Sequence, residues 1–157
     1  MSSTVTTIAK LRRRALDALE PARPAALLLA RIGVGLVFLS TGWGKIHDLD
    51  KVAHFFETLG IPAPGFQAAF VGYTELLCGA ALVVGLLSRL ATIPLIVSMV
   101  VAILTAKKDS LHGLFDLVGF DEFTYIVVLV MILVLGPGAW SADHAIAKRL
   151  EAEAERG

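Results

Sequence analysis

Four long stretches of the chain are apolar almost without interruption, and they set the predicted architecture. They cover residues 25–44, 66–87, 90–106 and 123–140. A helix needs about 20 mostly apolar residues to cross the hydrocarbon core of a bilayer. Because these residues run continuously and do not alternate with polar ones, they predict helices and exclude a membrane β-barrel. The sequence therefore predicts an all-α protein, a bundle of four transmembrane helices.

Polar segments lie on both sides of this predicted membrane domain, residues 25–140. In residues 1–24, apolar side chains recur at helical spacing beside Arg12, Arg13 and Arg14. That pattern is typical of a short basic amphipathic helix on the membrane surface, or of a basic tail that only sets orientation. Residues 141–157 form a polar tail in which Ser141 is placed to cap a helix.

Lysine and arginine are divided unevenly between the two ends of the predicted bundle. Nine lie in segments on the side of the termini, and four lie in the segments between spans one and two and between spans three and four. Positive charge is retained on the cytoplasmic side, so both termini are predicted to be cytoplasmic. The first apolar stretch contains Arg31 and is too long for a cleaved secretory signal. We therefore expect a multi-pass protein.

Composition narrows the class further. Hydrophobic residues make up 56% of the 157 residues, charged residues make up 18%, and mean hydropathy is +0.75. A soluble domain has about 25% charged residues, so an ordinary soluble enzyme is excluded. The net charge is zero, which leaves no basic field for a nucleic acid. The lipid bilayer is the expected partner.

Two charged residues, Arg31 and Glu75, lie inside predicted spans. A charge at bilayer depth costs about 2.5–3.5 kcal/mol on insertion scales, so such residues normally face the bundle interior and pair. Gly35 and Gly79 lie near them on the same helix faces, where small residues let backbones approach closely. We expect Arg31 to approach Glu75. The pair either handles a proton or a polar head group, or is a salt bridge that fixes helix register.

A second polar group lies at the outer rim of the predicted bundle. Lys45 and His47 end the first span, and Glu122 begins the fourth. These residues either anchor the interface, with a salt bridge between Lys45 and Glu122, or form the mouth of a pocket. His47, His54 and His112 all fall on this side and are weak candidates for metal ligands. No metal-binding motif connects them, so no metal site is predicted.

Several of these residues also follow one another in a familiar order. They are Arg31, Gly35 and Lys45, then Gly60-Ile61-Pro62, then Glu75, Gly79 and Arg89, and finally Gly136-Pro137-Gly138 with Ser141 and Asp143. Over about residues 25–145 the chain resembles the DoxX family of small bacterial and archaeal membrane proteins. The resemblance implies a four-helix bundle in the cytoplasmic (inner) membrane, with a polar signature of Arg31, Lys45, Glu75, Arg89 and Asp143. It also implies a redox setting, because members are linked to membrane-bound thiol, sulfur and oxidative-stress complexes.

Three functions are compatible with these features. The first is the membrane subunit of a quinone-linked oxidoreductase complex, with a partner protein that supplies electrons. Its catalytic candidates are Glu75, Arg31 and Tyr73, and the same residues with Gly35 and Gly79, which leave room for a ring, are candidates for binding a quinone cofactor. The second is a non-enzymatic scaffold or assembly factor that docks a partner protein or a second copy of the chain. The third is a small-solute transporter.

Overall fold

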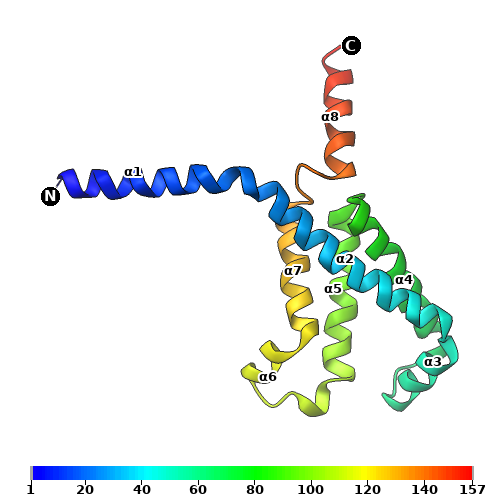
Figure 1. The fold of residues 1–157 in the computed structure, drawn as a ribbon. Coiled ribbons are helices and arrows are strands. Elements are labelled where there is room, and N and C mark those ends of the chain that lie inside the picture. Colours follow the sequence, from blue (N-terminus) through cyan, green and yellow to red (C-terminus); the bar gives the residue numbers. More distant parts are fainter. Residues whose placement is uncertain (1, 157) are drawn as a thin grey trace.

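In its computed structural model, which describes residues 2–156, the chain consists of helices joined by turns and loops (Figure 1). The all-α prediction is therefore confirmed. In chain order the elements are α1 (Ser2–Leu19), the 3-10 turn η1 (Glu20–Ala22), α2 (Arg23–His47), α3 (Leu49–Thr58), α4 (Pro64–Val84), α5 (Ser88–Thr105), the 3-10 turn η2 (Lys108–Ser110), α6 (Leu114–Gly119), α7 (Asp121–Leu135) and α8 (Ala142–Ala154).

Among the described residues, three helical stretches are long and apolar enough to cross a membrane. They are Thr7–His47, which contains α2, and the helices α4 and α5. They correspond to the first three predicted spans. The fourth, 123–140, contains a shorter helix than predicted, because α7 ends at Leu135. Gly136 follows with φ +83°, a left-handed conformation that favours glycine, and Pro137 cannot continue the hydrogen-bond ladder.

Helices α2 and α4 pack against each other through glycine residues. An added Cβ at Gly42 would overlap the backbone of Leu76, and one at Gly79 would lie 2.6 Å from the Leu39 nitrogen. A Cβ at Gly35 would lie 3.1 Å from the Gly79 carbonyl oxygen. Lipid tails are as apolar as the side chains, so moving an apolar side chain from lipid into a helix contact gains little. Close approach of the backbones therefore contributes much of the attraction between helices. The predicted protein-facing glycines are therefore helix-packing positions.

Helices α5 and α7 lie side by side and run in opposite directions (Figure 1). Near one end of the pair, Arg89 Nη2 donates to the Val134 carbonyl oxygen at 3.5 Å. Near the other end, Lys107 Nζ lies 3.8 Å from Glu122 Oε1. Contacts at both ends mean that α7 and its flanking residues extend along the whole of α5.

The core lies between α2, α4, α5 and α7. Its most deeply buried apolar side chains are at most 1% exposed and include Phe38, Leu82, Leu95, Leu129 and Ile132. The outward faces of the same helices carry large exposed apolar side chains, such as those of Leu29, Leu77, Leu104 and Val134. Apolar side chains on the outside of a helix bundle are typical of surfaces that face lipid.

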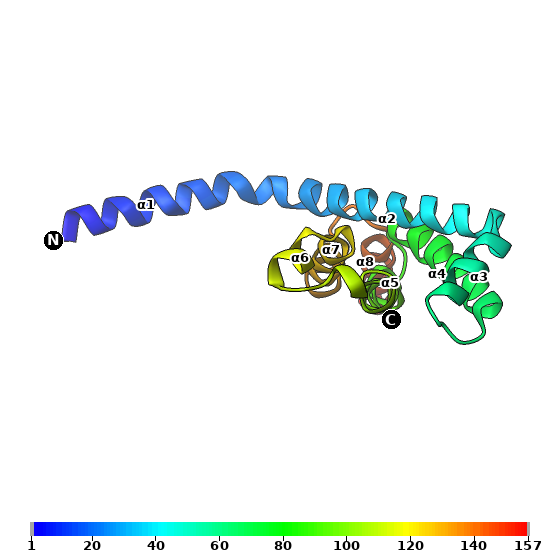
Figure 2. The same ribbon diagram turned by 90° about the horizontal axis from the view of Figure 1, so that it is seen from below.

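Two helices project from this bundle (Figures 1 and 2). α1 continues from the beginning of α2 away from the other helices in both views, with a bend between the two in Figure 1, and α8 stands beyond the ends of α4 and α5. α8 begins after Ser141, whose hydroxyl oxygen accepts a hydrogen bond from His144 N at 3.1 Å. The predicted cap at Ser141 is confirmed, and it marks the point where the chain leaves the bundle.

Candidate functional site

Glu75 lies at the centre of a polar cluster shared by three helices. Its carboxylate on α4 accepts hydrogen bonds from Thr41 Oγ1 at 2.8 Å and from Lys45 Nζ at 2.5 Å, both on α2. Ser98 Oγ on α5 donates to the other carboxylate oxygen at 3.3 Å. Glu75 is 1% exposed, and burying a carboxylate is tolerated only when it is paired and hydrogen-bonded. We call these four residues the Glu75 cluster.

The glycines around Glu75 explain how α2 reaches it. Gly72 and Gly79 lie about one turn before and after Glu75, on the face of α4 that meets α2. Their lack of side chains lets the α2 backbone approach closely. Thr41 and Lys45 are four residues apart and therefore project from one face of α2. The close approach brings both side chains within hydrogen-bond distance of the buried carboxylate.

The predicted approach of Arg31 to Glu75 is wrong. Arg31 is 2% exposed, but Nη1 donates to the Pro137 carbonyl oxygen at 3.1 Å and Nη2 donates to that of Trp140 at 2.9 Å. The loop after α7 has carbonyl groups that no helix satisfies, and a guanidinium with five donors suits them. A Cβ at Gly85 would overlap the guanidinium, so glycine is needed there.

The remaining rim prediction, a salt bridge between Lys45 and Glu122, is also wrong. Lys45 extends inward to Glu75, and Glu122 pairs with Lys107 at 3.8 Å. A long lysine side chain can bury its methylene stem along apolar surface while its ammonium reaches a distant partner. Spacing along one helix gives no information on which of two carboxylates that ammonium reaches.

Asp143 joins the start of α8 to the turn between α4 and α5. Its carboxylate oxygens accept hydrogen bonds from Leu87 N at 2.7 Å and from Ser88 N at 2.9 Å. Its own backbone N–H donates to the Gly85 carbonyl oxygen at 2.9 Å. The first N–H groups of a helix have no partner within it, so Asp143 caps α5 from a distant part of the chain. Arg31, Arg89 and Asp143 therefore gather at one end of the bundle.

Gly35 and Gly79 do not border an open space in the structure. The α2–α4 contact fills the volume beside them with backbone. Tyr73 lies elsewhere on α4, half exposed, and lines an apolar cavity of about 560 Å³ between α4 and α5. The other lining residues are Phe66, Ala69, Phe70, Thr74, Leu77, Cys78 and Pro94. The predicted set of quinone-binding residues is thus divided between a packed helix contact and a cavity.

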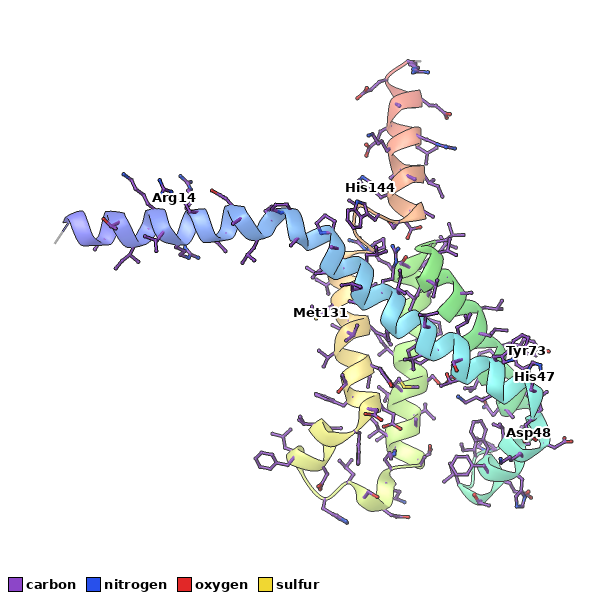
Figure 3. All side chains as sticks on the ribbon, in the orientation of Figure 1. Arg14, His47, Asp48, Tyr73, Met131 and His144 are labelled. Carbon is purple, nitrogen blue, oxygen red and sulfur yellow. The ribbon has the colours of Figure 1, made fainter. Side chains whose placement is uncertain are left out.

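The three outer histidines are not brought together. His47 Nδ1 lies 2.9 Å from the Trp43 carbonyl oxygen, and His54 lies 3.6 Å from Glu57. Figure 3 places His47 and Tyr73 near the same end of the bundle and His144 at the start of α8. Within residues 2–156, no group of three or more potential metal-ligating side chains was found.

Several residues of these sites were not predicted as site residues from the sequence. Thr41 and Ser98 complete the Glu75 cluster, and Thr74 and Pro94 line the cavity. A usable signal existed for Thr41, because it lies one turn before Lys45 and shares its helix face. Ser98 and Thr74 are single hydroxyls in apolar runs, and such hydroxyls commonly bond to their own helix backbone.

Comparisons with known proteins give consistent matches. The DoxX family model matches residues 26–108. The uncharacterized membrane protein Rv3486 of Mycobacterium tuberculosis is 36% identical over 82% of this chain and 86% of its own length. Inner membrane protein YqjF of Escherichia coli is 26% identical over 78% of this chain and 93% of its own length. CatD of Bacillus subtilis, whose name describes it as a candidate oxidoreductase, is 28% identical over 67% and 73%. No solved structure matches the chain.

Proposed function

Because the chain belongs to the DoxX family of membrane proteins, we propose that it is the inner-membrane subunit of a quinone-linked redox complex. The observation that carries the proposal is the cavity between α4 and α5, which adjoins the Glu75 cluster along both helices. Thr74 lines the cavity and immediately precedes Glu75. On α5, Pro94 lines it one turn before Ser98, which donates to Glu75.

The cavity has the chemistry that a quinone ring requires. Its walls are mostly apolar and include two parallel aromatic rings, Phe66 and Phe70, whose centroids are 6.0 Å apart. Ligand sites are typically apolar with a few polar groups that fix orientation. The hydroxyls of Tyr73 and Thr74 are the groups that can donate to quinone carbonyls, which find no water at bilayer depth.

In this proposal the Glu75 cluster conducts protons. Reduction of a quinone to a quinol consumes two electrons and two protons, and a partner dithiol that becomes a disulfide releases two of each. Glu75 and Lys45 form an ion pair whose lysine side chain is 26% exposed and whose carboxylate is 2% exposed. The pair therefore connects the polar end of α2 with the buried interior near the cavity. Arg31, Gly35 and Gly79 are assigned to packing and loop binding.

The same proposal includes a fourth span and cytoplasmic termini. Helix α7 has 15 residues, about 22 Å, which is shorter than the roughly 30 Å hydrocarbon core. Its antiparallel contacts with both ends of α5 support a complete crossing with its flanking residues. The uneven distribution of lysine and arginine supports cytoplasmic termini. On that side α1, with Arg12, Arg13 and Arg14, lies along the membrane surface.

The experiment measures quinone binding by purified protein in mild detergent. We expect quinone to be extracted from the wild-type protein, and an added quinone analogue to raise its melting temperature. Tyr73→Phe and Thr74→Val remove one hydroxyl each and should reduce that rise. Thr105→Val is the matched control, because its hydroxyl bonds to the Val101 carbonyl oxygen outside the cavity. Absence of extracted quinone, together with no rise in wild-type melting temperature, would contradict the proposal.

One observation favours a scaffold as the second candidate function. Helix α8 stands away from the bundle (Figure 1) and carries Ile146 and Leu150 four residues apart, 47% and 61% exposed. An unpartnered apolar stripe on a projecting helix is suited to binding a helix of another protein. If Ile146→Ser with Leu150→Ser releases a co-purified partner while the quinone analogue has no effect on melting in any variant, the scaffold function is the better explanation.

A further inference from the structure

A second cavity, of about 520 Å³, lies at the end of the bundle where α5 begins, α7 ends and α8 starts. Three leucines form its apolar walls, at positions 87, 90 and 135. Arg89 and His144 supply polar donors, and Gly136 with the loop after it forms the remaining wall. Because α5 is long and apolar enough to span a membrane, a cavity at its first turn lies at a membrane–water boundary.

Arg89 contributes a guanidinium with unused hydrogen-bonding capacity. Among the described residues the one hydrogen bond of this guanidinium runs from Nη2 to the Val134 carbonyl oxygen at 3.5 Å, and the guanidinium takes part in no ion pair within 4.0 Å. A guanidinium has five N–H donors. A Cβ at Gly136 would lie 3.1 Å from Nη2, so the glycine leaves space for the group beside the backbone.

Asp143 also lines this cavity, but its charge is already engaged. Both of its carboxylate oxygens accept backbone N–H groups, from Leu87 and Ser88. These are the free donors at the N-terminus of α5, where a negative charge is stabilised. Arg89 therefore faces the cavity without a paired carboxylate, and the exposed imidazole of His144 adds a second donor.

We propose that this cavity binds the phosphodiester headgroup of an anionic phospholipid, whose phosphate, unlike that of phosphatidylcholine, is not neutralised by a cation in the same headgroup. Arg89 donates to the phosphate oxygens in the bidentate geometry that suits a guanidinium, and His144 donates a further hydrogen bond. The leucine walls contact the first carbons of the acyl chains. A site of this kind holds the junction between α5, α7 and α8 to one leaflet of the membrane. It shares no lining residue with the quinone cavity.

The apolar walls distinguish a lipid from free phosphate. Leu87, Leu90 and Leu135 are 58%, 63% and 46% exposed. A soluble phosphate ion gains nothing from such walls, whereas an acyl chain covers them and removes apolar surface from water. The lipid headgroup is therefore the source of phosphate that uses every feature of the cavity.

The experiment compares the melting temperature of the full chain in three samples, two in nanodiscs and one in detergent. One nanodisc contains phosphatidylcholine alone, one contains phosphatidylcholine with phosphatidylglycerol, and the detergent sample receives inorganic phosphate. We expect phosphatidylglycerol to raise the wild-type melting temperature and to remain bound in native mass spectra. Arg89→Gln should weaken phosphatidylglycerol binding at least about tenfold, because it removes the charge-assisted hydrogen bonds of the guanidinium.

Arg149→Gln is the matched control, since it removes the same charge from an exposed site on α8 outside the cavity. His144→Gln is a milder second variant that should weaken binding less than Arg89→Gln does, in case the arginine variant folds poorly. Equal losses for Arg89→Gln and Arg149→Gln would overturn the proposal, because the effect would then be one of net charge. An equal rise with inorganic phosphate would overturn the assignment to a lipid.

Discussion

At the scale of single residues, the balance of donors and acceptors around Glu75 has a measurable consequence. Glu75→Gln keeps the shape of the side chain but removes the negative charge that Lys45 and two hydroxyls share. The ammonium of Lys45 then lacks a counter-charge near bilayer depth. We expect a loss of about 2 kcal/mol in the free energy of unfolding, since leaving one buried partner unsatisfied costs that order. Denaturation in detergent micelles measures it.

A mutant cycle separates this pairing from other effects of the substitution. Lys45→Met removes the charge that Glu75→Gln leaves unpaired, so the double variant should recover part of the loss. Glu57→Gln is the control, because Glu57 is exposed and its Oε2 lies 3.6 Å from Nδ1 of His54, which is also on the surface. Strictly additive effects of the two substitutions at Lys45 and Glu75 would contradict a direct interaction.

Burial of both intramembrane charges was predictable from the sequence, but their partners were not. The cost of a charge in lipid places Arg31 and Glu75 inside the bundle whatever the fold, and both are at most 2% exposed. The partner depends on the register between helices, which a one-helix pattern does not contain. For Arg31 the partners are backbone carbonyl groups of Pro137 and Trp140, which every residue type carries, so side-chain chemistry gave no signal.

At the scale of helices, glycine placement controls how α2 and α4 meet. Gly42→Ala adds a Cβ that would overlap the backbone of Leu76, so the helices must separate. We expect about 2 kcal/mol of destabilisation from this overpacking. Gly33→Ala lies on the same helix with nothing within 4 Å of the added Cβ. It should change stability by less than about 1 kcal/mol. Thermal unfolding of the two variants checks the difference.

Similar melting temperatures for these two alanine variants would contradict the packed α2–α4 contact. Because of this contact, a larger side chain at Gly79 tests the packing of α2 against α4 and does not test ligand binding. Leucine there would strike the backbone of Leu39 and Phe38, so loss of ligand binding in that variant would reflect a disrupted helix pair. Substitutions at Tyr73 and Thr74 test the cavity without this complication, because the cavity lies between α4 and α5.

The sequence predicted the positions of the helices better than it predicted where they end and what they contact. Runs of apolar residues located α2, α4 and α5, since lipid exposure imposes apolarity on every outward face. The fourth run overestimated the length of α7. The apolar character of the sequence continues through Gly136 and Pro137, whereas the helical hydrogen bonds stop at Leu135. The glycines were recognised as small, but small size alone does not say whether a backbone or a ligand occupies the adjacent space.

At the scale of the whole molecule, polar groups collect at different places along the bundle. Arg31, Arg89 and Asp143 organise the end where α8 leaves the bundle. The Glu75 cluster lies between α2, α4 and α5, and Lys45 connects it toward the end that carries α3. Because the two groups are separated, they do not compete for the same hydrogen-bond partners.

The path of the chain through the membrane gives the last prediction. If α7 crosses the bilayer antiparallel to α5, then α8 returns to the side of the N-terminus, whereas three crossings would leave it on the opposite side. We introduce Glu151→Cys on α8 or Asp116→Cys on α6, both at exposed positions, in a Cys78→Ala background. With a membrane-impermeant maleimide, Asp116→Cys should react in intact cells and Glu151→Cys should react only after permeabilisation. Reaction of both in intact cells would indicate three crossings, and reaction of Asp116→Cys only after permeabilisation would contradict the proposed orientation.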